Sequence, residues 1–264
     1  MGIGGETAQT IAARQGGLTI APSGAFTLGG AAGSSVTFTE GSFNDLTGGH
    51  IVPRSKSGYC YGWEGTCYLN GIPGTITKLE VNDKIKPRTL ISLTFTRAYD
   101  GEALSVNEGE SRILIPSGNM VKGDINVIFI GENGWHDINK DGEINEVDLS
   151  LIIDAMIQAT PNPERTIIIG LTTGTAQSRA DMEAFMQEKY GTRYINMRAH
   201  LSNLDTLEKA GVEVTQTDLD KIAVGSLPTS LWRDSSDYVH MNSKGYEIVA
   251  NKIYQTIQSL GFLD

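Results

Sequence analysis

The strongest constraint in this sequence is a change of hydrophobic pattern near Gly123. Before it, short runs that alternate apolar and polar residues are separated by Gly, Ser and Thr. Such alternation is typical of antiparallel strands with one covered face. The clearest runs are Ser35–Thr39, Gly74–Leu79, Leu90–Thr96 and Ser111–Ile115. We therefore expect residues 18–123 to form a β-rich insert.

After Gly123 the apolar runs become short and nearly continuous, as expected of parallel strands covered on both faces. These runs are Ile125–Ile130, Thr166–Leu171 and the shorter Arg193–Met197. Helical patterns lie between and after them, at Glu146–Ala159, Gln177–Tyr190 and Ser243–Leu260. The alternation predicts an α/β fold with a doubly wound parallel sheet, flavodoxin-like and three-layered (α/β/α). Active groups are then expected on loops at the carboxyl ends of the strands.

A further helix is expected over Glu6–Arg14, because helix-forming residues there end at two glycines. The predicted core comprises residues 1–17 and 124–264, and the insert comprises residues 18–123. The core is short for a complete α/β enzyme, so we expect its first strand to be missing from the order of segments that the pattern predicts.

Charge excludes some classes of partner. The chain has 264 residues, of which 31 are acidic and 21 basic, so its formal net charge is −10. A polyanion is a poor partner for phosphate backbones, so no nucleic-acid binding is expected. No apolar run approaches the ~20 residues that a membrane helix needs, so no membrane span is expected. The oligomeric state stays open.

Three short segments fall where an α/β sheet would place active loops. Gly2–Thr7 is a Gly-rich turn that runs into a helix, and its N–H groups could hold an oxyanion. Asn133 follows an apolar strand and could donate from its amide, although Asn is also a common turn residue. Asp237 precedes His240 by three residues, a spacing at which a carboxylate can orient an imidazole as a general base.

In this order, the three segments resemble those of the SGNH (GDSL-like) hydrolase family. The resemblance implies ester hydrolysis, with carbohydrate or acyl esters as the substrate class. It implies that His240 is the base, that Asp237 orients it, and that Gly5 and Asn133 form the oxyanion hole. The family usually has an Asp after the Asn, whereas this chain has Gly134.

The family's nucleophile is missing. It is a serine in a Gly-Asp-Ser block that lies upstream of the Gly turn, and no such block occurs in this chain. Ser23 is the one serine in a comparable turn, and it lies in the insert. Either the chain is a truncated hydrolase or it is a derivative without the nucleophile, so whether it is an enzyme stays open. Loss of the nucleophile would leave only residual activity.

A second motif lies directly after the Asn133 segment. Oxygen-bearing side chains occupy positions 1, 3, 5, 9 and 12 of a calcium-type loop: Asp137, Asn139, Asp141, Asn145 and Asp148. Gly142 stands where such a loop turns sharply, and the carbonyl of Glu143 would complete the ligand set. The loop resembles those of EF-hands and dockerins, so calcium is the expected cofactor. Dockerins carry two such loops, so cohesin binding is not expected. We expect calcium to stiffen the Asn133 segment.

Cys60 and Cys67 are the only two cysteines, and they fit either a small disulfide across a hairpin or two unrelated thiols. Four aromatic residues surround them, and these either pack internally or stack on sugar rings: Tyr59, Tyr61, Trp63 and Tyr68. The alternative function is therefore a non-catalytic, calcium-stabilised protein that binds a glycan or a protein. The calcium loop and the cysteine pair favour an extracellular or cell-surface location.

Overall fold

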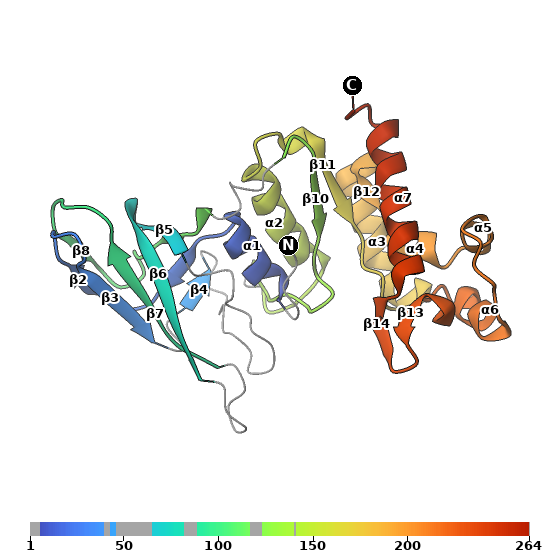
Figure 1. The fold of residues 1–264 in the computed structure, drawn as a ribbon, viewed down its shortest axis with the longest axis horizontal. Coiled ribbons are helices and arrows are strands. Elements are labelled where there is room, and N and C mark those ends of the chain that lie inside the picture. Colours follow the sequence, from blue (N-terminus) through green and yellow to red (C-terminus); the bar gives the residue numbers. More distant parts are fainter. Residues whose placement is uncertain are drawn as a thin grey trace. The chain divides into compact units, whose positions relative to one another are not determined.

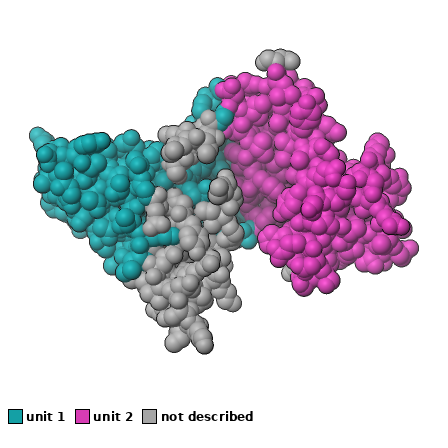
Figure 2. Space-filling model, in the orientation of Figure 1, with its two compact units in different colours: residues 1–123, 133–163 teal, residues 124–132, 164–264 magenta. Residues whose placement is uncertain are grey.

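The computed structural model describes residues 6–39, 43–45, 65–81, 89–116, 123–139 and 141–263. The chain forms two compact units, which Figure 2 shows in different colours. Unit 1 comprises residues 1–123 and 133–163, and unit 2 comprises residues 124–132 and 164–264. The core that the sequence predicts thus draws its residues from both units.

Unit 1 contains a seven-stranded sheet in the order β3-β7-β6-β5-β9-β1-β4, and every pairing in it is antiparallel. Its strands are β1 (Ile20–Pro22), β3 (Ser35–Thr39), β4 (Phe43–Asp45), β5 (Gly65–Leu69), β6 (Ile72–Val81), β7 (Thr89–Arg97) and β9 (Ile113–Leu114). Two more strands, β2 (Phe26–Leu28) and β8 (Leu104–Val106), pair with each other. The expected antiparallel strands are therefore present.

The pairing of β6 with β7 shows why the alternating pattern is a good guide here. Ile76 and Phe95 are fully buried, whereas Thr75 and Thr77 beside Ile76 are exposed. Gly74 allows a close approach within the sheet, because a Cβ atom there would lie 2.3 Å from the backbone oxygen of Thr96.

Two helices of unit 1, α1 (Ala8–Gln15) and α2 (Glu146–Gln158), pack against each other (Figure 1). Helix α1 ends at Gly16, whose φ of 87° is in the left-handed region that favours glycine. At Gly17 a Cβ atom would lie 2.8 Å from the Cα atom of Met156, so a glycine is needed where the end of α1 meets α2.

Unit 2 contains a three-stranded parallel sheet of β10 (Asn126–Phe129), β11 (Thr166–Ile169) and β12 (Tyr194–Ile195). Its helices are α3 (Ala176–Tyr190), α4 (Met197–Leu201), α5 (Leu204–Lys209), α6 (Gln216–Ala223) and α7 (Ser243–Ser259). An antiparallel hairpin joins β13 (Trp232–Asp234) to β14 (Asp237–Met241). Helix α7 packs against α4 and β14 (Figure 1). The buried core includes Ile167, Ile169, Ile195, Met241, Ile248 and Val249.

The predicted fold class, a flavodoxin-like doubly wound parallel sheet, is wrong. The largest sheet is antiparallel, and the parallel sheet has three strands in the sequential order β10-β11-β12. A doubly wound sheet requires strands that extend in both directions from a switch point, and this order has no such reversal. The helix between β10 and β11, α2, belongs to unit 1. Among the described helices, none is long and apolar enough to cross a bilayer.

Candidate functional site

Asp237 and His240 form a hydrogen-bonded pair on β14 in unit 2. Nδ1 of His240 lies 3.0 Å from Oδ1 and 2.8 Å from Oδ2 of the Asp237 carboxylate. The backbone N–H groups of Val239 and His240 also donate to Oδ1, at 3.2 and 3.0 Å. The N–H of His240 is the main cause that holds the pKa of Asp237 below its ordinary value. The carboxylate is thus fixed, and it stays ionised at neutral pH.

Arg233 is a third member of this cluster that the sequence analysis missed. Its guanidinium lies 2.6 Å from Oδ2 of Asp237, across the turn of the β13–β14 hairpin. The side chain of Asp237 is 13 % exposed, whereas that of His240 is 57 % exposed. A basic residue four positions before the Asp was a usable signal, because a tight hairpin brings such residues together.

The hydrogen bonds of the His240 ring within the described part of the chain are both made by Nδ1. Nε2 is therefore uncommitted, and no described hydroxyl or thiol is bonded to it. An imidazole whose Nδ1 is held by a carboxylate presents Nε2 as the basic atom. The pair can accept a proton from a reacting oxygen and stabilise the imidazolium that results.

Asn242 anchors the chain directly after the pair. Its Oδ1 accepts from the N–H groups of Lys244 and Gly245, both at 3.0 Å, and so caps α7. Its Nδ2 donates to the carbonyl of Ser230 at 2.7 Å. Met241, between His240 and Asn242, is buried in the core of unit 2. His240 is thus exposed on a rigidly held segment.

Asn133 lies in unit 1, against the segment that leads into α1. Its Nδ2 donates to the carbonyl of Glu6 at 3.2 Å, and the N–H of Ala8 donates to the carbonyl of Gly134 at 3.1 Å. Glu6 directly follows Gly5, which lies outside the described residues, as does the rest of Gly2–Gly5. An amide NH2 group has two N–H donors, so the bond to Glu6 leaves one of them for another acceptor.

The predicted site residues thus fall into two groups, one in each unit. Asp237 and His240 lie together in unit 2, whereas Asn133 lies beside the Gly-turn segment in unit 1. No family model, curated protein or solved structure matches the chain. The family resemblance therefore rests on the residues themselves.

Glu132 is a second residue that the sequence analysis did not single out. Its carboxylate accepts from the hydroxyl groups of Thr172 and Thr173, at 2.8 and 2.7 Å, and from the backbone N–H groups of both residues. Arg179 in turn donates to the carbonyl of Thr173 at 3.0 Å. These bonds join the carboxyl ends of β10 and β11, so Glu132 positions this edge of the parallel sheet.

A cavity of about 260 Å³ lies beside this edge in unit 2, and its lining includes Thr173, Lys221, Ser226 and Trp232. The ammonium group of Lys221 lies 5.5 Å from the centroid of the Trp232 ring, a cation–π geometry. Trp232 pairs with Met241 in the hairpin, and Met241 follows His240 in the chain. The hairpin that carries the Asp–His pair therefore also forms part of the cavity wall.

The predicted calcium loop is wound into a series of turns that its own side chains hold. Oδ2 of Asp137 accepts from the N–H of Gly142 at 2.9 Å, and Oδ1 of Asn139 accepts from the N–H of Asp141 at 3.0 Å. Oδ1 of Asp141 accepts from the N–H of Glu143 at 2.9 Å. Carboxylate and amide oxygens such as these are also the type of atom that binds a hard cation.

The end of the loop has a different role. Asp148 is fully buried, and its Oδ1 accepts from the N–H groups of Ile138 and Asn139 at 2.7 and 3.1 Å. Its Oδ2 accepts from the N–H of Asn145, which caps α2. The hard oxygens of the loop suit Ca²⁺ chemically. Within the described ranges, no three His, Cys, Asp or Glu side chains converge closely enough to form a metal site.

The cysteine prediction reaches beyond the described residues. Cys67 on β5 is a buried thiol, and burial raises its pKa to about 12. Cys60 lies outside the described residues, as do Tyr59, Tyr61 and Trp63, so the disulfide and the aromatic cluster stay predictions.

Proposed function

We propose that Asp237 and His240 are the acid–base pair of an SGNH-type ester hydrolase scaffold that acts on carbohydrate or acyl esters. The observation that carries this proposal is the 2.8 Å contact between Nδ1 of His240 and the Asp237 carboxylate, with Nε2 left uncommitted. The rigid anchor at Asn242 and the cavity beside the hairpin support it.

In this proposal Nε2 of His240 takes the proton from an attacking oxygen, and the Asp237 carboxylate stabilises the imidazolium. The same imidazolium then returns the proton to the leaving alcohol. The chain has no Gly-Asp-Ser block, so we expect only the residual hydrolysis that remains when such a site lacks its nucleophile.

The test is hydrolysis of p-nitrophenyl acetate by the chain and by His240→Ala. We expect the variant to lose at least about tenfold of the catalysed rate, since general-base catalysis contributes typically 10²–10⁴-fold. His50→Ala removes a histidine to which the proposal gives no role, and it is the control for unspecific imidazole chemistry. Equal rates for the two variants would show that His240 is not the base. Glycan-array binding together with that result would favour the non-catalytic alternative.

We also propose that the loop binds calcium through the side chains of Asp137, Asn139 and Asp141 and the carbonyl of Glu143. The two predicted ligands at its end have structural roles instead: Asn145 caps α2, and Asp148 accepts backbone N–H groups. The bound ion would supply positive charge that neutralises the clustered carboxylates. The indole N–H of Trp135 donates to the carbonyl of Asn145 at 2.7 Å, so a stiffer loop would restrain the Asn133 segment. Loops of this kind that bind weakly function where calcium is abundant, which suits an extracellular or cell-surface location.

Isothermal titration with CaCl2 and melting curves in calcium and in EDTA test this second proposal. We expect saturable heat and a higher melting temperature in calcium, because an ion that binds only the folded state stabilises it. Asp141→Ala should remove both effects. Identical melting curves with no titration heat would rule out the calcium site and leave the Asp237–His240 proposal untouched.

A further inference from the structure

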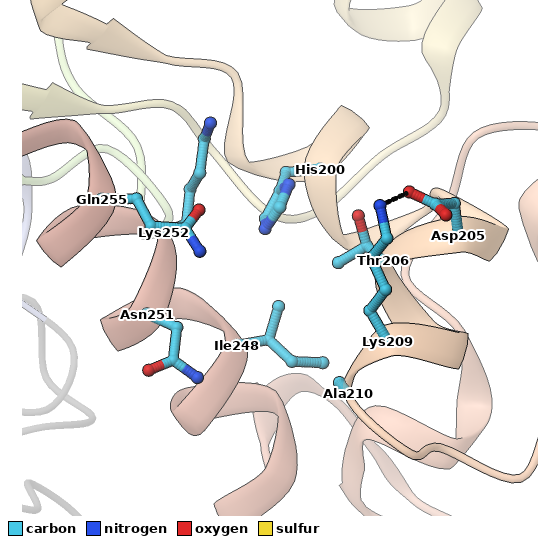
Figure 3. Close-up of a pocket in the computed structure, with 9 residues that line it drawn as sticks. All are labelled: His200, Asp205, Thr206, Lys209, Ala210, Ile248, Asn251, Lys252 and Gln255. Atoms are coloured by element: carbon cyan, nitrogen blue, oxygen red, sulfur yellow. Dashed lines mark hydrogen bonds and ion pairs between the residues drawn. The ribbon is translucent and has the colours of Figure 1, made fainter. Parts of the chain in front are cut away.

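A second cavity of unit 2, of about 320 Å³, lies between helices α4 and α5 and helix α7. In Figure 3, Asn251 and Lys252 of α7 lie on one side, and Thr206 and Lys209 of α5 lie on the other. His200 of α4 projects into the space between them. None of these residues belongs to the Asp237–His240 pair, so the cavity requires an explanation of its own.

The lining carries a net positive charge in an acidic protein. The ammonium group of Lys209 is paired with the carboxylate of Asp205 at 2.7 Å. Lys252 has no carboxylate partner within the described residues. The two lysines and Asp205 therefore leave a formal charge of +1 on the lining, whereas the whole chain carries −10. An uncompensated cation in a concave site attracts small anions.

The remaining polar groups of the lining are neutral side chains that can donate hydrogen bonds as well as accept them. The amide of Asn251, the hydroxyl of Thr206 and the imidazole of His200 can each donate, and the one carboxylate is already engaged by Lys209. A tetrahedral oxyanion such as phosphate accepts hydrogen bonds in several directions, so this donor set suits it. Ile248 and Ala210 add apolar surface next to the donors.

We propose that this cavity binds a phosphate monoester, with the phosphate group between Lys252 and His200 and the organic part against Ile248. Lys252 supplies the charge, and Asn251, Thr206 and His200 supply hydrogen bonds. The cavity is several times larger than one phosphate ion, which is why a monoester fills it better than inorganic phosphate does.

Binding is linked to the protonation of His200. In the free chain, burial lowers the pKa of His200, and the charge of Lys252 lowers it further. The other charged groups of the lining are Lys209 and Asp205, which offset each other. A bound dianion next to the ring favours the imidazolium, so it raises the pKa of His200. Binding of the dianion is then coupled to uptake of a proton by His200, and this contribution to affinity grows as the pH falls, as long as the ligand stays a dianion, that is, down to about pH 6.

The experiment is titration of the intact chain with phenyl phosphate and with inorganic phosphate at constant ionic strength, followed by NMR and calorimetry. We expect saturable binding, tighter for phenyl phosphate, and a His200 resonance whose pKa rises when phenyl phosphate is bound. Lys252→Gln should weaken binding at least about tenfold. Lys244→Gln is the matched control, because it removes a lysine from the first turn of the same helix, where Lys244 pairs with Glu247 at 2.8 Å.

His200→Gln keeps a hydrogen-bond donor at the site but removes the imidazole. The pH dependence of its affinity should therefore be only that of the ligand, whose second phosphate pKa is about 6, and the part due to His200 should be lost. Circular dichroism of each variant checks that it is folded. No saturable binding, or equal losses in Lys252→Gln and Lys244→Gln, would overturn the proposal. Because ester hydrolysis is assayed separately, this result does not depend on the fate of the Asp237–His240 proposal.

Discussion

Asp148 in unit 1 and Asp237 in unit 2 make similar hydrogen bonds to the backbone but have different side-chain neighbours. Each carboxylate accepts backbone N–H groups from a tight turn. Asp148 is fully buried, and its contacts within the described part of the chain are with backbone N–H groups. Asp237 also contacts two side chains, Arg233 and the largely exposed His240. A carboxylate surrounded by backbone stabilises a loop, whereas one that holds an exposed imidazole prepares a proton acceptor. The two sites should therefore respond oppositely to substitution.

The largest loss of stability is expected at Asp148. Replacing it by alanine leaves three backbone N–H groups without their acceptor inside the protein, and each such group costs about 1–3 kcal/mol. We expect Asp148→Ala to lower the free energy of unfolding of unit 1 by about 3 kcal/mol or more. Urea denaturation in EDTA measures this without any contribution from calcium.

Asp148→Asn is the control, because it keeps one acceptor oxygen and the shape of the side chain. It should cost less than the alanine variant. If Asp148→Ala costs under about 1 kcal/mol, water replaces the carboxylate and the contrast with Asp237 fails.

These contacts also show what could be predicted from sequence. The periodicity of Tyr246, Val249, Ile253 and Ile257 predicted a helix from Ser243 to Leu260, and α7 spans Ser243–Ser259. Strand β3 matches its predicted bounds, because alternation on a half-covered strand reflects a local property. The pairing of strands is not local. Apolar runs predicted β10, β11 and β12, but no run encodes the order in which strands pair, so the sheet was wrongly predicted to be doubly wound.

The short helices between β12 and β13 were missed for another reason. Helices α4, α5 and α6 have five to eight residues, too few for a hydrophobic period to stand out. Their caps were visible in the sequence: Asn196, Asn203 and Thr215 each accept an N–H at a helix start. At the site, the pairing of Asp237 with His240 follows from a spacing of three, but the contact of Asn133 with Glu6 joins segments 127 residues apart, which spacing alone does not encode.

The next effect concerns Asp218, a buried aspartate in the same unit as the Asp–His pair. Burial alone would raise the pKa of Asp218, but N–H groups of Thr215 and Ser230 and hydroxyls of Thr229 and Thr215 lower it to about 2. A lowered folded-state pKa stabilises the protein above the ordinary value of 3.8, and this contribution is lost as the pH falls toward 2. We expect unit 2 to lose stability over that interval.

Asp218→Asn should lower the free energy of unfolding by about 1–3 kcal/mol at pH 7, because buried donors lose an acceptor. It should also make the stability of unit 2 less dependent on pH in acid, because the ionisable group is gone. Melting curves from pH 7 to pH 2 measure both. Asp220→Asn, at an exposed position of the same helix, is the control. An unchanged acid profile in Asp218→Asn would show that other groups set the acid stability of unit 2.

A smaller loss of stability is expected at Asn133. Like Asp148, it holds a segment of unit 1 by a hydrogen bond to the backbone, but it is exposed. Asn133→Ala removes the hydrogen bond to the carbonyl of Glu6, so we expect a loss of about 1 kcal/mol in unit 1. Asn133→Asp should cost more, because it places a carboxylate oxygen against that carbonyl. If thermal denaturation ranks the two variants the other way, the amide does not hold the Gly-turn segment in solution.

The smallest effect on stability, and the sharpest on activity, is expected at Asp237. Asp237→Asn keeps an acceptor for the N–H groups of Val239 and His240, and the side chain is near the surface, so the melting temperature should barely change. The amide cannot stabilise an imidazolium, so ester hydrolysis should fall at least about tenfold. The pKa of Asp237 is held below its ordinary value, chiefly by the N–H of His240, so the wild-type carboxylate is ionised at neutral pH, where both rates are measured. Asp234→Asn is the matched control, since Asp234 lies in the same hairpin and accepts from Ser236 rather than from His240. A variant that melts like wild type and hydrolyses as slowly as His240→Ala separates function from scaffold at this carboxylate. A variant that loses stability but keeps its rate would show that Asp237, like Asp148, stabilises its loop and has no role in the reaction.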